Sequence, residues 1–205
     1  MTEILTERLC LRPFRPEDLP AFVAYRSAPE VARYQSWSTS YAMADAERFL
    51  AEQQGLVFGE PGPWMQLAVI DRKHGELCGD CAVRVASDQH ATAELGVTLA
   101  PQRQGGGLAR EALTAVITTL VDEHAIHRIY AETDERNEAV HHLLERLGFR
   151  CEAQLVEADW FKDEWCSLRI YAILRREWNA LLAGEGSVWD RPRRVLRTST
   201  RLRSP

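Results

Sequence analysis

Apolar side chains alternate in some segments of the chain and recur every three or four residues in others. Residues 92–99 alternate, so four apolar side chains share one face of a predicted strand, while Glu94, Gly96 and Thr98 lie on the other face. From Leu108 to Val121 the apolar spacing is helical, which predicts a long helix packed on a core. Between these segments the three consecutive glycines at 105–107 interrupt both patterns.

The same patterns predict the other elements of the chain. Strands are expected at 8–14, 64–71, 77–85, 128–133, 149–157 and 165–174, and helical segments at 16–27, 28–33, 41–53, 138–147 and 175–182. In the 138–147 helix, His141 and His142 are expected on the solvated face. The residues expected to point inward there are Ala139, Val140, Leu143, Leu144 and Leu147. This order of elements predicts a single α/β domain with a mixed, mostly antiparallel sheet of about six to seven strands flanked by helices.

Composition is that of an ordinary globular protein, with 45% hydrophobic and 27% charged residues in a chain of 205. No apolar run approaches the roughly 20 residues that a membrane-spanning helix needs, so no membrane partner is expected. The first ten residues carry charges and lack the apolar block of a secretion signal. Five cysteines, an odd number, suggest no disulfide framework, and we expect a cytoplasmic protein.

Charge is spread unevenly along the chain. Residues 186–205 hold six arginines and one aspartate, a local charge of +5, whereas the whole chain carries −5. The remainder is therefore at about −10, which disfavours nucleic acid as the main partner and favours cationic ligands such as amines. We expect a domain over residues 1–183 and a flexible arginine-rich extension over 184–205. Nucleic-acid binding by that extension is an alternative that truncation would test.

The glycine run precedes a helix N-terminus, where unpaired N–H groups and the positive end of the helix dipole favour an anion such as phosphate. A P-loop is excluded because no Lys-Ser or Lys-Thr follows the glycines. A dinucleotide-binding fingerprint requires Gly or Ala at the position that Arg110 occupies. The run therefore predicts an anion site of a different type.

Gln102-x-x-Gly105-x-Gly107 followed by Leu108-Ala109 resembles the acyl-CoA signature of the GNAT (GCN5-related N-acetyltransferase) superfamily. Other blocks resemble its RimJ/RimL-type ribosomal-protein-alanine acetyltransferase branch, and they occur in the same order over about 170 residues. These blocks are Thr6-Glu7-Arg8-Leu9-Cys10-Leu11-Arg12 with Pro16-Glu17-Asp18, Glu76-Leu77-Cys78-Gly79-Asp80, Asn137-Glu138-Ala139-Val140 with Leu144-Glu145-Arg146-Leu147-Gly148-Phe149, and Arg175-Arg176-Glu177-Trp178.

The resemblance implies direct transfer of an acetyl group from acetyl-CoA to an amine. It also implies a sheet splayed at the acetyl-CoA site, where strand 95–99 pairs with the pantetheine arm. The Val97 N–H is the expected donor to the thioester oxygen, and Asn137 is expected to contact pantetheine or to cap its helix. The full set expected to bind the cofactor is Val97, Leu99, Gln104, Gly105, Gly106, Gly107, Leu108, Ala109 and Asn137. Arg103, Arg110 and Arg146 are candidates for the ribose phosphate or for solvated surface charges.

Glu94 is the candidate general base, because a carboxylate on the glycine-loop strand beside Gly96 can take a proton from the attacking ammonium. The alternative roles of Glu94 are to bind the cationic acceptor or to pair with an arginine. Tyr34 and Trp37 are candidates for acceptor binding or for loop packing. The positions where the family carries a Tyr and a Ser hold Leu144 and Val140, so no general acid is evident.

The acceptor stays open between a peptide or protein N-terminus and a small cationic amine, and the chain is expected to be a monomer or homodimer. No metal is expected, because Cys78 and Cys81, three apart in a predicted strand, face opposite sides. A non-catalytic acyl-CoA-binding sensor or partner-binding protein is the alternative function that the missing Tyr and Ser suggest.

Overall fold

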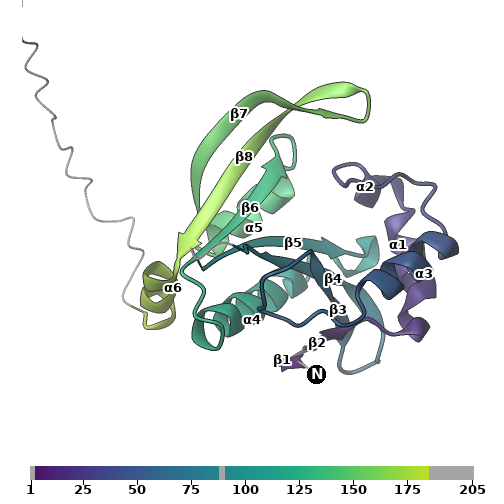
Figure 1. Cartoon of the computed structure of the whole chain (residues 1–205), viewed down its shortest axis with the longest axis horizontal. Helices are drawn as coiled ribbons and strands as arrows, with labels where there is room; N and C mark the ends of the chain where they lie inside the picture. The colour runs from purple at the N-terminus through teal and green to yellow at the C-terminus, as the bar shows by residue number, and fades with distance from the viewer. Residues whose placement is uncertain (1–2, 88–90, 185–205) are drawn as a thin grey trace, which may run out of the picture.

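The computed structural model describes residues 3–87 and 91–184 (Figure 1). Its strands are β1 Ile4–Leu5, β2 Leu9–Pro13, β3 Met65–Asp71, β4 Leu77–Val85, β5 Thr92–Leu99, β6 Arg128–Asp134, β7 Arg150–Phe161 and β8 Glu164–Leu174. Its α-helices are α1 Leu19–Arg26, α2 Pro29–Ala32, α3 Met43–Glu52, α4 Leu108–Asp122, α5 Glu138–Arg146 and α6 Arg175–Leu182. The predicted extension beyond Gly184 lies outside the described residues.

All the described strands form one sheet in the order β1-β2-β3-β4-β5-β6-β8-β7. Every neighbouring pair is antiparallel except β5 and β6, which are parallel. The mixed α/β fold is therefore confirmed, with eight strands in place of the expected six or seven. The additional strand is the two-residue β1, which pairs with Leu11 and Cys10 of β2 and is too short to produce a readable alternation.

The parallel pair at the centre of the sheet is short. Only Thr92–Glu94 of β5 align with Arg128–Tyr130 of β6, whereas β5 pairs with β4 along its whole length. Beyond Glu94 the two strands part, so the second half of β5 has β4 on one side and a gap on the other. This is the splay that the resemblance implied.

Helices cover both faces of the sheet (Figure 1). On one face, α4 packs its predicted apolar stripe against the inward side chains of the central strands, together with α5 and α6. On the other face, α1 and α3 enclose a second cluster rich in aromatic rings. Alternation in β5 assigns Ala93 and Leu95 to the α4 face and Glu94, Gly96 and Thr98 to the face that carries α1 and α3.

A buried ion pair holds the start of the first helical segment against β2. Asp18 accepts two hydrogen bonds from Arg12, at 2.7 and 2.9 Å, and a third from the Arg15 backbone N–H at 2.8 Å. Both side chains are less than a tenth exposed. The segment begins as a 3-10 turn, Pro16–Asp18, and continues as α1, where the sequence predicted one continuous helix.

Asp18→Ala is expected to lower the free energy of unfolding by about 3–5 kcal/mol, because it leaves the Arg12 charge buried without a partner. Urea unfolding followed by circular dichroism measures the change. Glu3→Gln is the matched control, since Glu3 forms an exposed ion pair with Arg15 and its loss is expected to cost under about 1 kcal/mol. Equal effects of the two substitutions would contradict the assigned role of the buried pair.

Candidate active site

Backbone groups of β5 point into the gap between β5 and β6. The Ala86 N–H donates to the Thr92 carbonyl at 2.9 Å, and the Ala100 N–H donates to the Cys78 carbonyl at 2.8 Å. These bonds place the even-numbered residues of β5 in hydrogen-bonded pairs with β4. Because the bonding direction alternates along an antiparallel strand, the odd-numbered residues direct their N–H and C=O groups away from β4. The Val97 N–H, predicted as the oxyanion donor, therefore faces the gap.

The far end of this edge meets the glycine turn. The Gln104 side-chain amide donates to the Leu99 carbonyl at 3.0 Å, which joins two residues that the sequence analysis assigned to the cofactor. Gly105 and Gly107 both have φ of +77°, a left-handed conformation that favours glycine. Gly107 is the N-cap residue of α4, and Leu108 and Ala109 form its first turn. All three glycines are exposed, so the turn can be approached by a ligand.

Asn137 lies at the start of α5. Its side-chain oxygen accepts a hydrogen bond from the Val140 N–H at 3.4 Å, so the helix-capping interpretation is confirmed. A capping side chain at a helix end can also contact a ligand. Contact between Asn137 and pantetheine stays a prediction.

The structure corrects two predictions about which residues of α5 are buried. His141 is not on the solvated face: it is 5% exposed, its Nε2 lies 3.2 Å from the Thr133 hydroxyl, and its ring stacks on Tyr171. Burial lowers the pKa of its imidazole, with the charge of Arg169 acting in the same direction. Ala139 is exposed and does not point inward. The buried face of α5 is thus turned toward β8. The apolar spacing of α5 alone cannot show that the helix packs against this strand.

Leu144 and Val140 occupy the positions where the family carries a Tyr and a Ser hydroxyl. Leu144 is 2% exposed and belongs to the main core, and Val140 is half-buried against it. Neither side chain can supply a proton. Thiolate is nevertheless a tolerable leaving group, because a thiol pKa is about 8.5.

Glu94, the predicted base, is held by two partners. Arg84 forms an ion pair with its carboxylate, and the Tyr130 hydroxyl donates to the same oxygen at 3.0 Å. The side chain is 13% exposed. Burial and the nearby Glu94 charge raise the pKa of Tyr130. The pairing with arginine considered from the sequence is thus present, and catalysis by Glu94 stays a prediction.

Glu132 is a second carboxylate on this face, and the sequence reasoning missed it. It follows Tyr130 by two residues on β6, just after the pairing with β5 ends. Glu132 is exposed, yet partial desolvation raises the pKa of its carboxylate, and the charges of Glu94 and Asp159 raise it further. Among the described residues no hydrogen bond or ion pair engages its carboxylate. Its place on β6, two residues after the last alignment with β5, is the only signal that could have drawn attention to it.

The three arginines considered for the ribose phosphate differ in their surroundings. Arg103 pairs with Asp71 at 3.3 Å and also with Glu76, so two carboxylates already hold its guanidinium. Arg110 and Arg146 are exposed. Only these last two keep the solvated character that the sequence analysis described.

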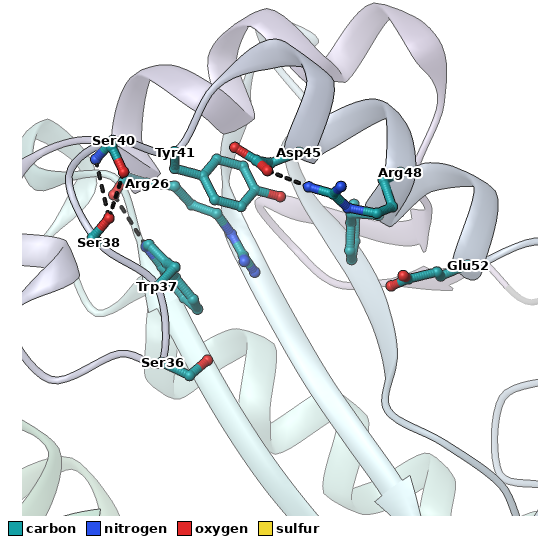
Figure 2. Close-up of a pocket in the computed structure, with 10 residues that line it drawn as sticks. Arg26, Ser36, Trp37, Ser38, Ser40, Tyr41, Asp45, Arg48 and Glu52 are labelled. Atoms are coloured by element: carbon teal, nitrogen blue, oxygen red, sulfur yellow. Dashed lines mark hydrogen bonds and ion pairs between the residues drawn. The ribbon is translucent and has the colours of Figure 1, made fainter. Parts of the chain in front are cut away.

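Trp37 lines a pocket of about 400 Å³ between the end of α1 and α3 (Figure 2). Its indole N–H donates to the Arg26 carbonyl at 3.1 Å, and the Arg26 guanidinium stacks 3.7 Å from the centre of its ring. The pocket also presents Tyr41 and the ion-paired side chains of Asp45 and Arg48. It combines aromatic walls with charges of both signs.

Tyr34 does not line this pocket. Its hydroxyl donates to the Arg136 carbonyl at 3.3 Å, across to the turn between β6 and α5. Nearby, the Lys162 ammonium donates to the Ala32 carbonyl, so a side chain at the tip of the β7–β8 hairpin contacts α2. The two residues proposed for acceptor binding therefore lie at different places: Trp37 in the pocket and Tyr34 in this bridge.

In the part of the chain that the structure describes, no group of three or more His, Cys, Asp or Glu side chains is arranged to hold a metal ion. Within residues 3–87 and 91–184, no helix combines the length and apolar character needed to cross a bilayer.

The structure therefore contains the parted strands and the exposed glycine turn that the sequence motifs implied. A family model described as an acetyltransferase (GNAT) domain matches residues 8–150. The chain belongs to the GNAT acetyltransferase family, as its motifs predicted.

Known proteins agree with this assignment. The N-acetyltransferase p20 of Bacillus licheniformis is 26% identical over 178 residues, which cover 87% of this chain and 99% of p20. A GNAT-family acetyltransferase from Bacillus anthracis has a TM-score of 0.77 at 26% identity, covering 86% of this chain and all of that one. Spermidine N-acetyltransferase from Vibrio cholerae, solved with CoA and spermine, shares the fold with a TM-score of 0.73 at 21% identity, covering 85% and 99%.

Proposed function

We propose that this protein transfers the acetyl group of acetyl-CoA directly to a primary amine. The observation that carries the proposal is the free edge of β5, which is followed by a short 3-10 turn, Pro101–Arg103, and then by the glycine turn at the N-terminus of α4. A pantetheine arm laid along this edge pairs as an added strand. The same arm delivers its pyrophosphate to the turn, where exposed N–H groups and the helix dipole stabilise negative charge.

The chemistry then follows from the groups beside the gap. The amine attacks the thioester carbonyl from the face of the sheet that carries Glu94 and Glu132. The Val97 N–H stabilises the oxyanion as it forms. Collapse of the tetrahedral intermediate breaks the C–S bond and releases CoA as a thiolate. The nitrogen gives up its second proton to form the neutral amide, and the thiolate takes up one proton through solvent.

An amine must lose its proton before it can attack, and two carboxylates lie on the correct face. Arg84 and the Tyr130 hydroxyl already engage the Glu94 carboxylate, whereas the Glu132 carboxylate has no partner among the described residues and its pKa is raised, so Glu132 is free to take a proton from the amine. We assign the base to Glu132. Glu94 is the alternative, and it also orients Tyr130.

The acceptor is a peptide N-terminus or a small cationic amine. The charges of Glu94 and Asp159 both act on Glu132, and this concentration of negative charge favours a positively charged acceptor. The likeness to a spermidine N-acetyltransferase fold is compatible with a polyamine, and the N-terminal motif resembles the RimJ/RimL-type branch that acetylates ribosomal proteins. A non-catalytic acyl-CoA sensor is the competing function, because Val140 and Leu144 supply no acid.

Two measurements test the proposal. Calorimetry with acetyl-CoA should show one binding site per chain, and thiol release should rise when amines are added. A panel of spermidine, spermine and peptides with free N-termini then separates the acceptor classes. Absence of acetyl-CoA binding would refute the proposal, and binding without thiol release with any amine would favour the sensor.

We further propose that residues 1–183 form the catalytic domain of a cytoplasmic enzyme that acts as a monomer or homodimer. All five cysteines are free thiols, which is compatible with a reducing compartment. Ending the chain after Leu182, at the last residue of α6, is expected to leave acetyl transfer and thermal stability unchanged. Comparing kcat/KM and Tm of the full and shortened chains checks this, and a large loss would mean that the extension belongs to the domain.

A further inference from the structure

The Thr6–Leu9 segment at the N-terminal edge of the domain is docked on the glycine turn. Arg8 donates from its backbone N–H to Glu111 Oε1 at 2.8 Å and from its side-chain Nε to Oε2 at 2.6 Å. The Thr6 hydroxyl donates to the same carboxylate at 2.5 Å. Glu111 lies in the first turn of α4, directly behind the glycines. Its carboxylate thus fixes where the Arg8 guanidinium lies.

The fixed guanidinium reaches the glycine turn itself. Arg8 Nη1 donates to the Gly106 carbonyl at 2.9 Å. A Cβ built on Gly107 would lie 3.6 Å from Arg8 Nη2, so the guanidinium stands against both glycines. An arginine nearly a hundred positions earlier in the sequence therefore contacts this turn.

The bond to the Gly106 carbonyl determines where the next N–H points. In a planar trans peptide the C=O and the N–H point in opposite directions. Because this peptide joins two glycines, steric hindrance to its rotation is small. With the Gly106 carbonyl held by Arg8, the Gly107 N–H points away from Arg8, and no group among the described residues accepts its hydrogen bond.

We infer that Arg8 is a positioning residue that holds the Gly107 N–H in the orientation that binds the donor pyrophosphate. This inference rests on the proposed function and adds a determinant of donor affinity from outside the glycine signature. Arg8 acts by orientation, since the Glu111 carboxylate at 2.6 Å largely neutralises its charge. Burial on its own raises the pKa of Glu111, but hydrogen bonds from Thr6 and Arg8 outweigh it and lower the pKa, so the carboxylate stays charged at neutral pH.

Donor truncation separates this role from a general loss of structure. Arg8→Gln is expected to weaken acetyl-CoA binding about tenfold, the effect of one hydrogen bond to a charged group. It should leave kcat at saturation and kcat/KM for S-acetylpantetheine, which lacks the pyrophosphate, unchanged. Arg15→Gln is the matched control. Arg15 is also a half-exposed arginine paired with a carboxylate, that of Glu3, but it follows the other end of β2.

Glu111→Gln provides a second, independent test, in which the direction of the change in acetyl-CoA affinity distinguishes two roles of Arg8. If Arg8 acted through its charge, removing the neutralising carboxylate would tighten acetyl-CoA binding. If Arg8 acts by orientation, loss of the anchor weakens binding in the same direction as Arg8→Gln. Glutamine replaces one of the two accepting oxygens with an NH2 group, which cannot accept, so the anchor is weakened while Arg8 stays in place. Glu111→Gln therefore also serves if Arg8→Gln does not fold.

Three results overturn the inference while the wild type still binds acetyl-CoA: unchanged affinity in Arg8→Gln, an equal loss for both donors, or tighter binding in Glu111→Gln. A wild-type protein that binds neither acetyl-CoA nor CoA would instead overturn the proposed function itself.

Discussion

Gly106→Glu is expected to weaken acetyl-CoA binding by about a hundredfold. A side chain at this position meets open space and its φ is not positive, so the substitution places a carboxylate beside the turn without straining the backbone. At about 5 Å and an effective dielectric constant of about 20, repulsion between this carboxylate and one pyrophosphate charge is about 3 kcal/mol. Calorimetric titration with acetyl-CoA measures the loss.

Gly106→Gln is the control for this substitution, because glutamine has nearly the same shape and no charge. The difference in affinity between the two variants isolates the electrostatic part of the loss, and raising the salt concentration should reduce this difference. Equal affinities for the two variants would show that the pyrophosphate does not lie on this turn.

Glu132→Gln is expected to lower kcat by about a hundredfold, the usual contribution of a positioned general base. The dissociation constant for acetyl-CoA should stay unchanged, since Glu132 lies on the acceptor face. The pH profile provides the sharper readout. Only the deprotonated carboxylate accepts a proton, so wild-type kcat falls as pH drops through the raised pKa of Glu132, and this acid limb should disappear in the variant.

Glu94→Gln is the matched comparison, on the neighbouring strand and the same face. It removes the charge that pairs with Arg84 but keeps an amide oxygen that can accept from the Tyr130 hydroxyl, so a smaller loss of about tenfold is expected, with the acid limb retained. If Glu94→Gln abolishes the acid limb and Glu132→Gln does not, the base is Glu94, as the sequence alone predicted.

The strand, the glycine turn and the helix of the proposed donor site were predictable because each is local in sequence. Alternation in 92–99 defines which face Glu94 occupies, and the glycines followed by an apolar helical stripe define the turn and α4. The same local reading located Asn137 at a helix N-terminus.

The acceptor half depends on contacts between distant segments, and these escaped prediction. Tyr34 meets Arg136, and Lys162 meets Ala32, across about 100 residues or more of sequence. Burial of His141 depends on Tyr171 of β8. Periodicity predicts where this strand lies in the sequence, but it does not predict which strands are its neighbours in the sheet. No spacing rule within α5 could have located this partner.

The parting of β5 and β6 also makes the protein modular for engineering. The proposed donor-binding groups lie mostly between β5 and the first turn of α4, whereas the α1–α3 region and the β7–β8 hairpin border the proposed acceptor side. A loop graft between α1 and α3 could therefore retarget the enzyme to a new amine while the cofactor-binding stretch stays untouched. The limit on such a graft is the contact between Lys162 and Ala32, since a new loop must still meet the hairpin.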